Sequence, residues 1–494
     1  MTVQAAKDRL YALEKRMTAY NHALGLISYD AVTGAPAGTA AARGETLAIL
    51  GEECYKMGTS EELKQILDTL SAAQTDEKTA RIVELRQEER EEMSKIPMEE
   101  YVGFQTLLNE ADAVWHKAKA ENDYPAFAPY IDKIVVAYKR FAAYVAPDKP
   151  VYDYLLDKFE PELTTAVLDK FFGDLRRELV PLIKRVTAAP QIDAAPALIP
   201  FSIPKQREFS DKLMELLGID RAHCTIAETE HPFTTNFTKY DVRITTKYIA
   251  DLFASSMYSV VHEGGHALYE LNTADDLAYT CLGTGVSMAV HESQSRFYEN
   301  IIGRSRGFVN MVYPIAAELA PELKAFTPEQ LYRAVNAAQP SLIRCDADEL
   351  TYCLHIMVRY ELEKALFNGE ITSKELPREW NRLYMEYLGI EVPTDREGVL
   401  QDSHWAGGMF GYFPSYALGS AYGAQLLHKM QETVDVEGDL ARGDLTQISE
   451  WLRRNIWQYG ALKKPKPLME QAFGGAFDAK YYVEYLKRKY EELY

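Results

Sequence analysis

The stretch VVHEGGHALYE, residues 260–270, has the apolar residues of a helix at both ends and two adjacent glycines in its middle. A glycine in a helix interior costs about 1 kcal/mol relative to alanine. This helix carries that cost twice, between His262 and His266. Because glycine allows close backbone approach, we expect another element to pack there, either the helix that contains Glu292 or a strand that binds substrate. Close packing without any function is compatible with the same pattern.

His262 and His266 are four residues apart, so on a helix they lie on one face and their imidazoles can bind one ion. Glu263, between them, is too close in sequence to share that ion. In HExxH sites this glutamate is the general base, which takes a proton from water that the metal has acidified and delivers it to the leaving amine. The alternative interpretation of these five residues is a pair of surface histidines on an acidic helix.

The segment GTGVSMAVHESQSRFYENI, residues 283–301, supplies a third ligand for such an ion. Zinc hydrolases usually hold the metal through three protein side chains and leave a fourth position open for water. Glu292 completes a set of two histidines and one glutamate. His291 is the competing ligand, and the alternative for it is a residue that supports the ligands or lines the cleft. Three of the ten histidines fall within residues 262–291, which favours a site.

The composition limits the classes of partner. The 494 residues are 47% hydrophobic and 26% charged, with a net charge of −19, which is unfavourable for binding nucleic acid or anionic membrane surfaces. No apolar run approaches the roughly 20 residues that span a bilayer, and the N-terminal segment lacks the apolar core of a signal peptide. Five cysteines without a CxxC pair indicate reduced thiols. We therefore expect a cytoplasmic protein.

Helical periodicity dominates the chain, and one segment has the pattern of a small sheet. Long helices are predicted over residues 99–145, 164–187, 308–336 and 354–388. Four prolines within residues 187–204 predict a break. In HPFTTNFTKYDVRITTKY, residues 231–248, Val242 and Ile244 alternate with polar residues as in a strand, and TTNFTKY can turn the chain back as a hairpin. The predicted fold class is therefore mainly α, with a small antiparallel sheet near the double-glycine helix.

With four further motifs, the chain resembles the carboxypeptidase Taq family of metallocarboxypeptidases. Six short motifs mark this family, and all are present in order: HPF (231–233), DVRIT (241–245), HEGGH (262–266), HESQ (291–294), IRCDAD (343–348) and GVLQDSHW (398–405). The resemblance implies a large, nearly all-helical peptidase fold with a deep substrate groove. We expect a single catalytic domain over residues 1–494, with room for two lobes around the groove and the catalytic motifs within residues 231–416.

The resemblance also implies an activity and a cofactor. Single residues would be removed from peptide C-termini, with broad preference and poor action near proline. One divalent metal per subunit, usually zinc with cobalt able to replace it, would be held by His262, His266 and Glu292. Glu263 would be the catalytic base. The enzyme would be a homodimer that acts on peptides with a free C-terminus.

An exopeptidase must recognise a free C-terminal carboxylate, and arginine can bind it through two parallel hydrogen bonds. We favour Arg344 for this role; its alternative is an ion pair with an aspartate of the same IRCDAD motif. Arg243, on the polar face of the predicted strand, either binds substrate or pairs with Asp241, while the strand itself can align substrate by backbone pairing. His231 contacts substrate or caps the strand. His291 is a further candidate for a substrate contact.

The tetrahedral intermediate of peptide hydrolysis needs hydrogen-bond donors for its oxyanion. The glycine-rich segment QDSHWAGGMFGYFPSYALG, residues 401–419, supplies three candidates, His404, Tyr412 and Tyr416, of which His404 and Tyr412 are favoured. His404 lies inside a motif of the family. Because the chain has 32 tyrosines, packing is the alternative for Tyr412. His355 and Arg359, four residues apart, face either the groove or the helix surface.

Two other functions fit parts of this pattern. An endopeptidase or dipeptidyl carboxypeptidase can use the same metal ligands, and cleavage of peptides with an amidated C-terminus would distinguish it. The second rival is a helical binding protein whose metal site is purely structural. Structural zinc sites are usually closed and need no carboxylate base, so the role of Glu263 distinguishes this rival from an enzyme.

Overall fold

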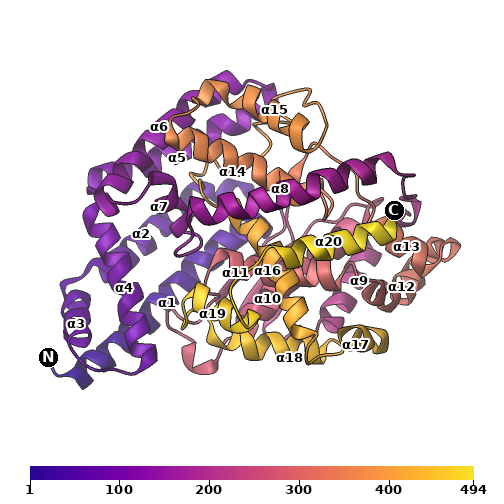
Figure 1. The fold of residues 1–494 in the computed structure, drawn as a ribbon. Helices are drawn as coiled ribbons and strands as arrows, with labels where there is room; N and C mark the ends of the chain where they lie inside the picture. Colours follow the sequence, from indigo (N-terminus) through magenta and orange to yellow (C-terminus); the bar gives the residue numbers. More distant parts are fainter. The chain divides into compact units, whose positions relative to one another are not determined.

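The computed structural model describes residues 1–494, except the side chain of Ala37, and consists mainly of α-helices (Figure 1). The chain divides into two compact units. Unit 1 comprises Met1–Glu91, Ala194–Val335 and Leu426–Ala476, and unit 2 comprises Glu92–Asp193, Asn336–Gln425 and Phe477–Tyr494. Each unit is therefore assembled from three separate stretches of the chain.

Most of unit 1 is helical. Its α-helices, assigned by the majority of their residues, are α1 (Val3–Thr33), α2 (Ala40–Thr59), α3 (Glu61–Ser71), α4 (Glu77–Lys95), α9 (Ile203–Leu216), α10 (Phe253–Leu271), α11 (Met288–Arg296), α12 (Arg306–Leu319), α13 (Pro328–Val335), α17 (Val436–Arg442), α18 (Thr446–Asn455) and α19 (Pro465–Phe473). Hydroxyl side chains cap several first turns: Thr2, Ser60 and Ser287 each accept a hydrogen bond from the backbone N–H three residues on. These caps explain where the helices begin.

Unit 2 contains the remaining α-helices. They are α5 (Met98–Glu121), α6 (Tyr124–Val145), α7 (Val151–Asp157), α8 (Thr165–Ala188), α14 (Tyr352–Asn368), α15 (Leu376–Tyr387), α16 (Pro414–Met430) and α20 (Lys480–Leu493). The predicted helix over 164–187 is confirmed as α8. The predicted helices over 99–145 and 354–388 are each divided in two, because Asn122 and Gly369 adopt left-handed backbone conformations that end α5 and α14.

Two predicted boundaries concern unit 1. The expected helix over 308–336 is also interrupted: α12 ends at Leu319, and a short 3₁₀ segment, Pro321–Ala325, separates it from α13. The break predicted over residues 187–204 is confirmed, since only a 3₁₀ turn at Ala195–Ala197 lies between α8 and α9. Proline accounts for both interruptions, because it cannot donate the backbone hydrogen bond that continues a helix.

The small sheet lies in unit 1 and consists of β1 (Cys224–Glu228), β2 (Thr234–Thr238) and β3 (Asp241–Thr246). Its strand order is β1-β3-β2. β2 and β3 form the predicted antiparallel hairpin, but β1 runs parallel to β3, so the sheet is mixed rather than antiparallel. Because β3 is the central strand and has partners on both sides, it cannot pair with a substrate backbone, and that part of the prediction was wrong.

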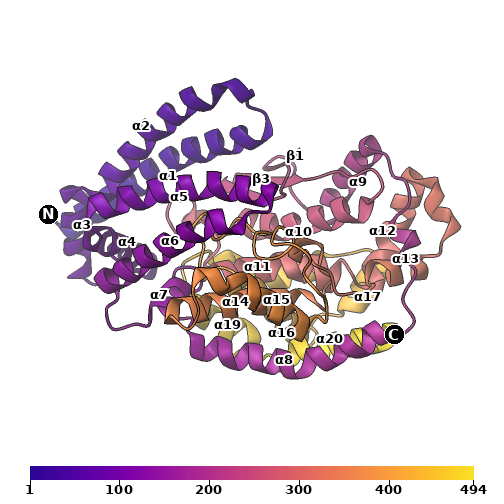
Figure 2. The same ribbon diagram turned by 90° about the horizontal axis from the view of Figure 1, so that it is seen from above.

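Within unit 1, α10 packs against α9, α11 and β3. Figures 1 and 2 show α10 and α11 side by side in both views. The burial pattern of β3 follows the predicted alternation, with Val242 and Ile244 fully buried and Arg243 half-buried between them. Among the described residues, no helix combines the length and the apolarity that crossing a membrane requires. The five cysteines are free thiols.

Candidate metal centre and active site

The two glycines of α10 are needed because other elements approach this helix closely. A Cβ atom on Gly265 would lie 2.6 Å from the carbonyl oxygen of Gln294 and 2.8 Å from Cα of Ser295, both on α11. A Cβ atom on Gly264 would lie 2.8 Å from Cδ1 of Leu217, which is the flexible end of a side chain. The expectation that the helix of Glu292 packs against the glycine pair is therefore confirmed for Gly265.

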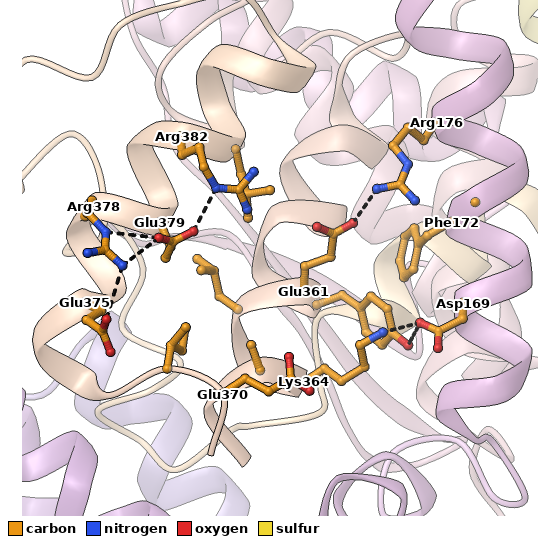
Figure 3. Close-up of a pocket in the computed structure, with 16 residues that line it drawn as sticks. Asp169, Phe172, Arg176, Glu361, Lys364, Glu370, Glu375, Arg378, Glu379 and Arg382 are labelled. Carbon is orange, nitrogen blue, oxygen red and sulfur yellow. Dashed lines mark hydrogen bonds and ion pairs between the residues drawn. The ribbon is translucent and has the colours of Figure 1, made fainter. Parts of the chain in front are cut away.

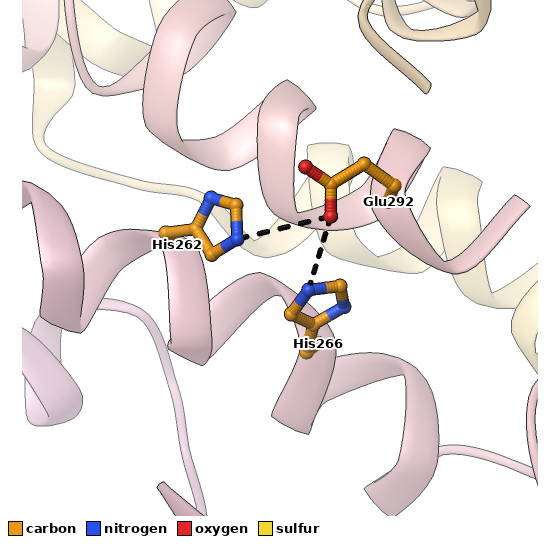
Figure 4. Close-up of side chains that lie close together, drawn as sticks. All are labelled: His262, His266 and Glu292. Atoms are coloured by element: carbon orange, nitrogen blue, oxygen red, sulfur yellow. Dashed lines mark ion pairs between the residues drawn. The ribbon is translucent and has the colours of Figure 1, made fainter. Parts of the chain in front are cut away.

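This close packing brings His262, His266 and Glu292 together (Figure 4). Nε2 of His262 lies 3.8 Å from Oε2 of Glu292, and Nε2 of His266 lies 3.4 Å from the same oxygen. The three donor atoms lie within 4.8 Å of one another. Zinc binds nitrogen and oxygen at about 2.0–2.2 Å in a tetrahedral arrangement, which separates neighbouring donors by about 3.3 Å. The residues present therefore fit a divalent metal of this kind.

The carboxylate of Glu299 orients His262, one of the two histidines. Nδ1 of His262 lies 2.8 Å from Oε2 of Glu299, which leaves Nε2 of the same ring directed toward Glu292. Glu299 lies in the π-helix Phe297–Ile302 that continues α11, and such π-helical turns occur frequently at functional sites. A carboxylate on the outer nitrogen of a metal-binding histidine fixes the tautomer and the ring orientation.

The second histidine is held differently. Nδ1 of His266 lies 2.6 Å from Nδ1 of His291, and Nε2 of His291 lies 2.6 Å from Oε1 of Glu270. His291 therefore contacts a predicted ligand rather than joining the three converging donor atoms. Glu270 is buried and lies at the C-terminal end of α10.

The ligand carboxylate is kept ionised by its neighbours. Burial acts to raise the pKa of Glu292, but the positive charge of Arg296 and the neighbouring imidazoles outweigh it and hold that pKa well below its usual range. Nε of Arg296 lies 2.7 Å from Oε1 of Glu292, so the other oxygen, Oε2, faces the histidines. An ionised carboxylate with one oxygen directed at two imidazoles is a suitable ligand for a cation.

Glu263 is buried beside this cluster, and only 5% of its surface is exposed. Oγ1 of Thr234, on β2, lies 2.6 Å from Oε2 of Glu263 and 3.0 Å from the carbonyl oxygen of the same residue. Burial raises the pKa of the Glu263 carboxyl above its ordinary value. A raised pKa makes a carboxylate a stronger proton acceptor at neutral pH.

The other two predicted residues of unit 1 lie on and before the sheet. Nε and Nη2 of Arg243 lie 2.9 and 3.0 Å from the two carboxylate oxygens of Asp241, so the ion pair considered as an alternative is present. The guanidinium also lies over the rings of Tyr29 and Phe237, 5.3 Å from each centroid. His231 is exposed, and its carbonyl oxygen accepts a hydrogen bond in the turn before β2.

Arg344 lies in unit 2, within a buried cluster of charges. Its Nε and Nη2 donate to Oδ1 of Asp402 at 3.0 and 2.8 Å, and its Nη1 donates to the Tyr352 hydroxyl at 3.0 Å. Arg359, which is fully buried, donates to Oδ2 of the same aspartate. The partner of Arg344 is thus Asp402 and not an aspartate of its own motif. The suggestion that Arg359 lies on a helix surface was wrong.

His404 and Tyr412 lie close together in the loop before α16. Their ring centroids are 5.5 Å apart, and both side chains are half-buried. Nε2 of His404 lies 3.4 Å from the hydroxyl of Tyr416. Burial, reinforced by the positive charge of Arg344, lowers the pKa of His404 to about 4, so this imidazole is neutral at physiological pH.

Comparison with known proteins agrees with this arrangement. Residues 9–490 match the family model described as carboxypeptidase Taq (M32) metallopeptidase. The chain belongs to this M32 family. It is 40% identical to carboxypeptidase 1 of Bacillus subtilis (strain 168) and 36% identical to thermostable carboxypeptidase 1 of Thermus thermophilus, in each case over 100% of both chains. The crystal structure of the M32 carboxypeptidase from Deinococcus radiodurans R1 matches with a TM-score of 0.97 at 33% identity, covering 99% of both chains.

This M32 protein is accordingly a metallocarboxypeptidase, and the resemblance noted from its six motifs is confirmed. Its candidate metal site consists of His262, His266 and Glu292. The mainly helical fold class is confirmed as well.

Sequence reasoning missed several residues that hold the M32 site in place. Glu299, Glu270 and Thr234 each contact a predicted site residue. Glu299 follows Glu292 by seven residues, which is two helical turns, so helix periodicity could have suggested it. Thr234 and Glu270 carried no comparable signal, because their contacts depend on how β2 and α11 pack against α10.

Figure 3 shows a pocket of about 710 Å³ in unit 2 of the M32 protein, lined mainly by α8, α14 and α15. Its charged side chains pair with one another: Arg176 with Glu361, Lys364 with Asp169, and Arg378 and Arg382 with Glu379. Among the described residues, none of the predicted site residues lines it. The pocket therefore adds nothing to the metal centre.

Proposed function

We propose that this M32 carboxypeptidase removes single residues from the C-termini of peptides, with broad preference and poor action near proline. The observation that carries the proposal is the convergence of His262, His266 and Glu292 beside the buried carboxylate of Glu263. Two imidazoles and one carboxylate are the donor set of a catalytic zinc site with one position left open. Zinc is therefore the proposed metal, with cobalt as a substitute.

The chain's own residues then divide the chemistry among them. A bound divalent metal would polarise the scissile carbonyl and lower the pKa of water. Glu263 accepts a proton from the attacking water and delivers it to the leaving amine. The hydroxyl of Thr234, 2.6 Å from Oε2, holds this carboxylate in one orientation. Because the Glu263 carboxylate is buried, bulk water competes little for its hydrogen bonds.

Recognition of the C-terminal carboxylate is assigned to Arg344. The contacts with Asp402 and Tyr352 use three of its five N–H groups. The local cluster contains two guanidinium groups, those of Arg344 and Arg359, and one carboxylate from Asp402, which leaves a positive charge to be balanced. Arg243 is a weaker candidate, because Asp241 already engages it through two hydrogen bonds.

Stabilisation of the oxyanion is assigned to His404 and Tyr412. A phenol hydroxyl and a neutral imidazole N–H can both donate a hydrogen bond to a developing negative charge. The lowered pKa of His404 supports a neutral donor. His231, exposed in the turn before β2, remains a candidate for contact with the substrate chain.

The test uses a blocked tripeptide with either a free or an amidated C-terminus, and a peptide ladder followed by mass spectrometry. We expect stepwise loss of single C-terminal residues from the free peptide only, complete inhibition by a chelator, and recovery with zinc or cobalt. Equal cleavage of the amidated peptide would contradict the proposal and favour an endopeptidase. Release of dipeptides would favour a dipeptidyl carboxypeptidase.

Three further properties are proposed, the domain organisation and the oligomeric state from the M32 family and the location from the composition of the chain. We infer that residues 1–494 act as one catalytic domain, which is supported by the continuous match of the family model over residues 9–490. We also infer a homodimer that works in the cytoplasm on peptides. Light scattering of the purified protein tests the dimer, and fractionation of the source cells tests the location.

A further inference from the structure

We propose that His291 and Glu270 are positioning residues that prepare His266 for metal binding through an imidazole-to-imidazole hydrogen bond. This inference rests on the proposed metal site, and among the roles considered for His291 it selects support of a ligand rather than contact with substrate. The structure shows a continuous chain of close contacts from Glu270 through His291 to His266.

The series of contacts begins at Glu270, a carboxylate that is surrounded by hydrogen-bond donors. Oε1 of Glu270 accepts hydrogen bonds from the Thr284 hydroxyl at 2.9 Å and the Gly285 backbone N–H at 3.0 Å. Its other oxygen accepts one from the side-chain amide of Asn236 at 2.6 Å. A carboxylate only accepts hydrogen bonds. The nitrogen of His291 that lies 2.6 Å from Oε1 must therefore carry a proton.

The remaining protons follow from this first assignment. An imidazole that carries its single proton on Nε2 has a lone pair on Nδ1. That lone pair faces Nδ1 of His266 at 2.6 Å, so His266 must donate its Nδ1 proton. Nε2 of His266 is then unprotonated, and this is the atom that lies 3.4 Å from the ligand oxygen of Glu292. The contacts thus select the one tautomer of His266 that can bind a metal through Nε2.

The space around His291 is shaped for an imidazole. A Cβ atom on Gly285 would lie 2.5 Å from Cδ2 of His291 and 2.9 Å from the ring of Tyr269. The ring centroids of His291 and Tyr269 lie 5.1 Å apart. A residue larger than glycine at position 285 would displace His291 from its contact with His266.

The two histidines of the proposed metal site are each supported by a carboxylate, one directly and the other through a second imidazole. His262 contacts Glu299 directly, whereas His266 reaches Glu270 only through His291. Loss of such outer partners typically weakens metal affinity by about 10–100-fold. The distinctive expectation is that Glu270, whose carboxylate contacts His291, affects metal affinity only while His291 is present.

The experiment measures zinc affinity of the metal-free full-length protein by competition with a chromophoric chelator, together with the visible absorption of the cobalt-loaded form. We compare wild type, Glu270→Gln, His291→Phe and the double variant. The control is His223→Phe, which removes an exposed histidine paired with Asp220 in the same unit. Thermal unfolding of each metal-free protein reports whether the variants fold.

We expect Glu270→Gln and His291→Phe each to weaken zinc binding by about 10–100-fold, the double variant to bind no more weakly than His291→Phe alone, and the control to match wild type. The cobalt spectrum should change in both single variants. If wild type bound zinc tightly and the variants bound it with affinities within about twofold of wild type, this inference would be overturned. The proposed function would stay intact. A wild-type protein that bound no zinc would instead overturn the proposed metal site itself.

Discussion

The candidate metal centre of unit 1 and the arginine cluster of unit 2 are both buried groups of charges, but they carry opposite excess charge. Around His262 and His266, the carboxylates of Glu263, Glu292 and Glu299 outnumber the neighbouring guanidinium groups. Around Asp402, the guanidinium groups of two arginines share one carboxylate. Buried charges are stable only when they are paired or bind an ion. The first cluster therefore suits a cation and the second an anion.

The difference also shows how each cluster is kept in place. The metal centre relies on close packing of α10 against α11, which the glycine pair allows. The arginine cluster relies on hydrogen bonds, because Asp402 accepts from both Arg344 and Arg359. Loss of Glu263 in unit 1 should accordingly affect catalysis most, and loss of Asp402 in unit 2 should affect folding stability most.

The largest expected effect is on catalysis in unit 1. Glu263→Gln should lower kcat by about 10²–10⁴-fold, the range that a general base contributes, while zinc content stays at the wild-type level. Peptide hydrolysis and metal analysis measure the two quantities, and Glu61→Gln, an exposed residue of α3, is the control. Full activity in the Glu263 variant would remove the catalytic role from the first cluster and leave only a structural metal site.

The next effect tests the charge balance in unit 2. Asp402→Asn should destabilise the protein by about 3–5 kcal/mol, because it leaves two buried guanidinium groups without their shared carboxylate. Asp174→Asn, which breaks exposed ion pairs on α8, should change stability by no more than about 1 kcal/mol. Urea unfolding at neutral pH measures both. Similar losses in the two variants would show that burial of the arginine cluster is unimportant.

A pH-dependent effect sharpens the comparison, because unit 2 also contains a buried carboxyl held by uncharged donors. Glu363 accepts hydrogen bonds from the Tyr152 hydroxyl, the Trp405 indole and the Gly411 backbone. Burial raises its pKa from 4.5 to about 7. Between these values the native protein keeps a proton that the unfolded chain releases, so stability falls as pH rises from about 4.5 to about 7, by up to about 3 kcal/mol.

Glu363→Gln should remove this contribution to the pH dependence. Urea unfolding of wild type and variant at pH 5, 6, 7 and 8 gives the difference in slope, whatever the variant does to stability as a whole. Wild type should lose stability relative to the variant between pH 5 and 7 and remain parallel to it above that range. Parallel curves throughout would mean that Glu363 titrates in the native state as it does in the unfolded chain.

The smallest expected effect concerns the adjacent glycines of α10. Gly265→Ala should destabilise the protein by about 1–3 kcal/mol and weaken zinc binding, because the new methyl group meets the backbone of α11. Gly264→Ala is the matched control, since its methyl group meets only the flexible ends of Leu217 and Ile219, and the better helix propensity of alanine offsets part of the strain. Thermal unfolding and chelator competition measure both variants. Equal effects would contradict the close approach at Gly265.

The residues predicted best from the sequence are those whose relation is set by one helix. His262, Glu263 and His266 lie within five positions, and the geometry of an α-helix places the two imidazoles on one face. Glu292 was predicted from its chemistry and its motif. Arg344 was predicted as a charged group in a site, but its partner was not, because Asp402 lies 58 residues further along the chain.

The sequence by itself therefore determined the family, the helical class and the donor set of the candidate metal centre, because short motifs and helical spacing record contacts between residues that are close in the chain. Only the tertiary structure decided that β3 is a central strand, that Glu299 and Glu270 stand behind the two histidines, and that two arginines share Asp402. These relations depend on which elements pack together. Packing is decided by the whole core of each unit rather than by any local pattern.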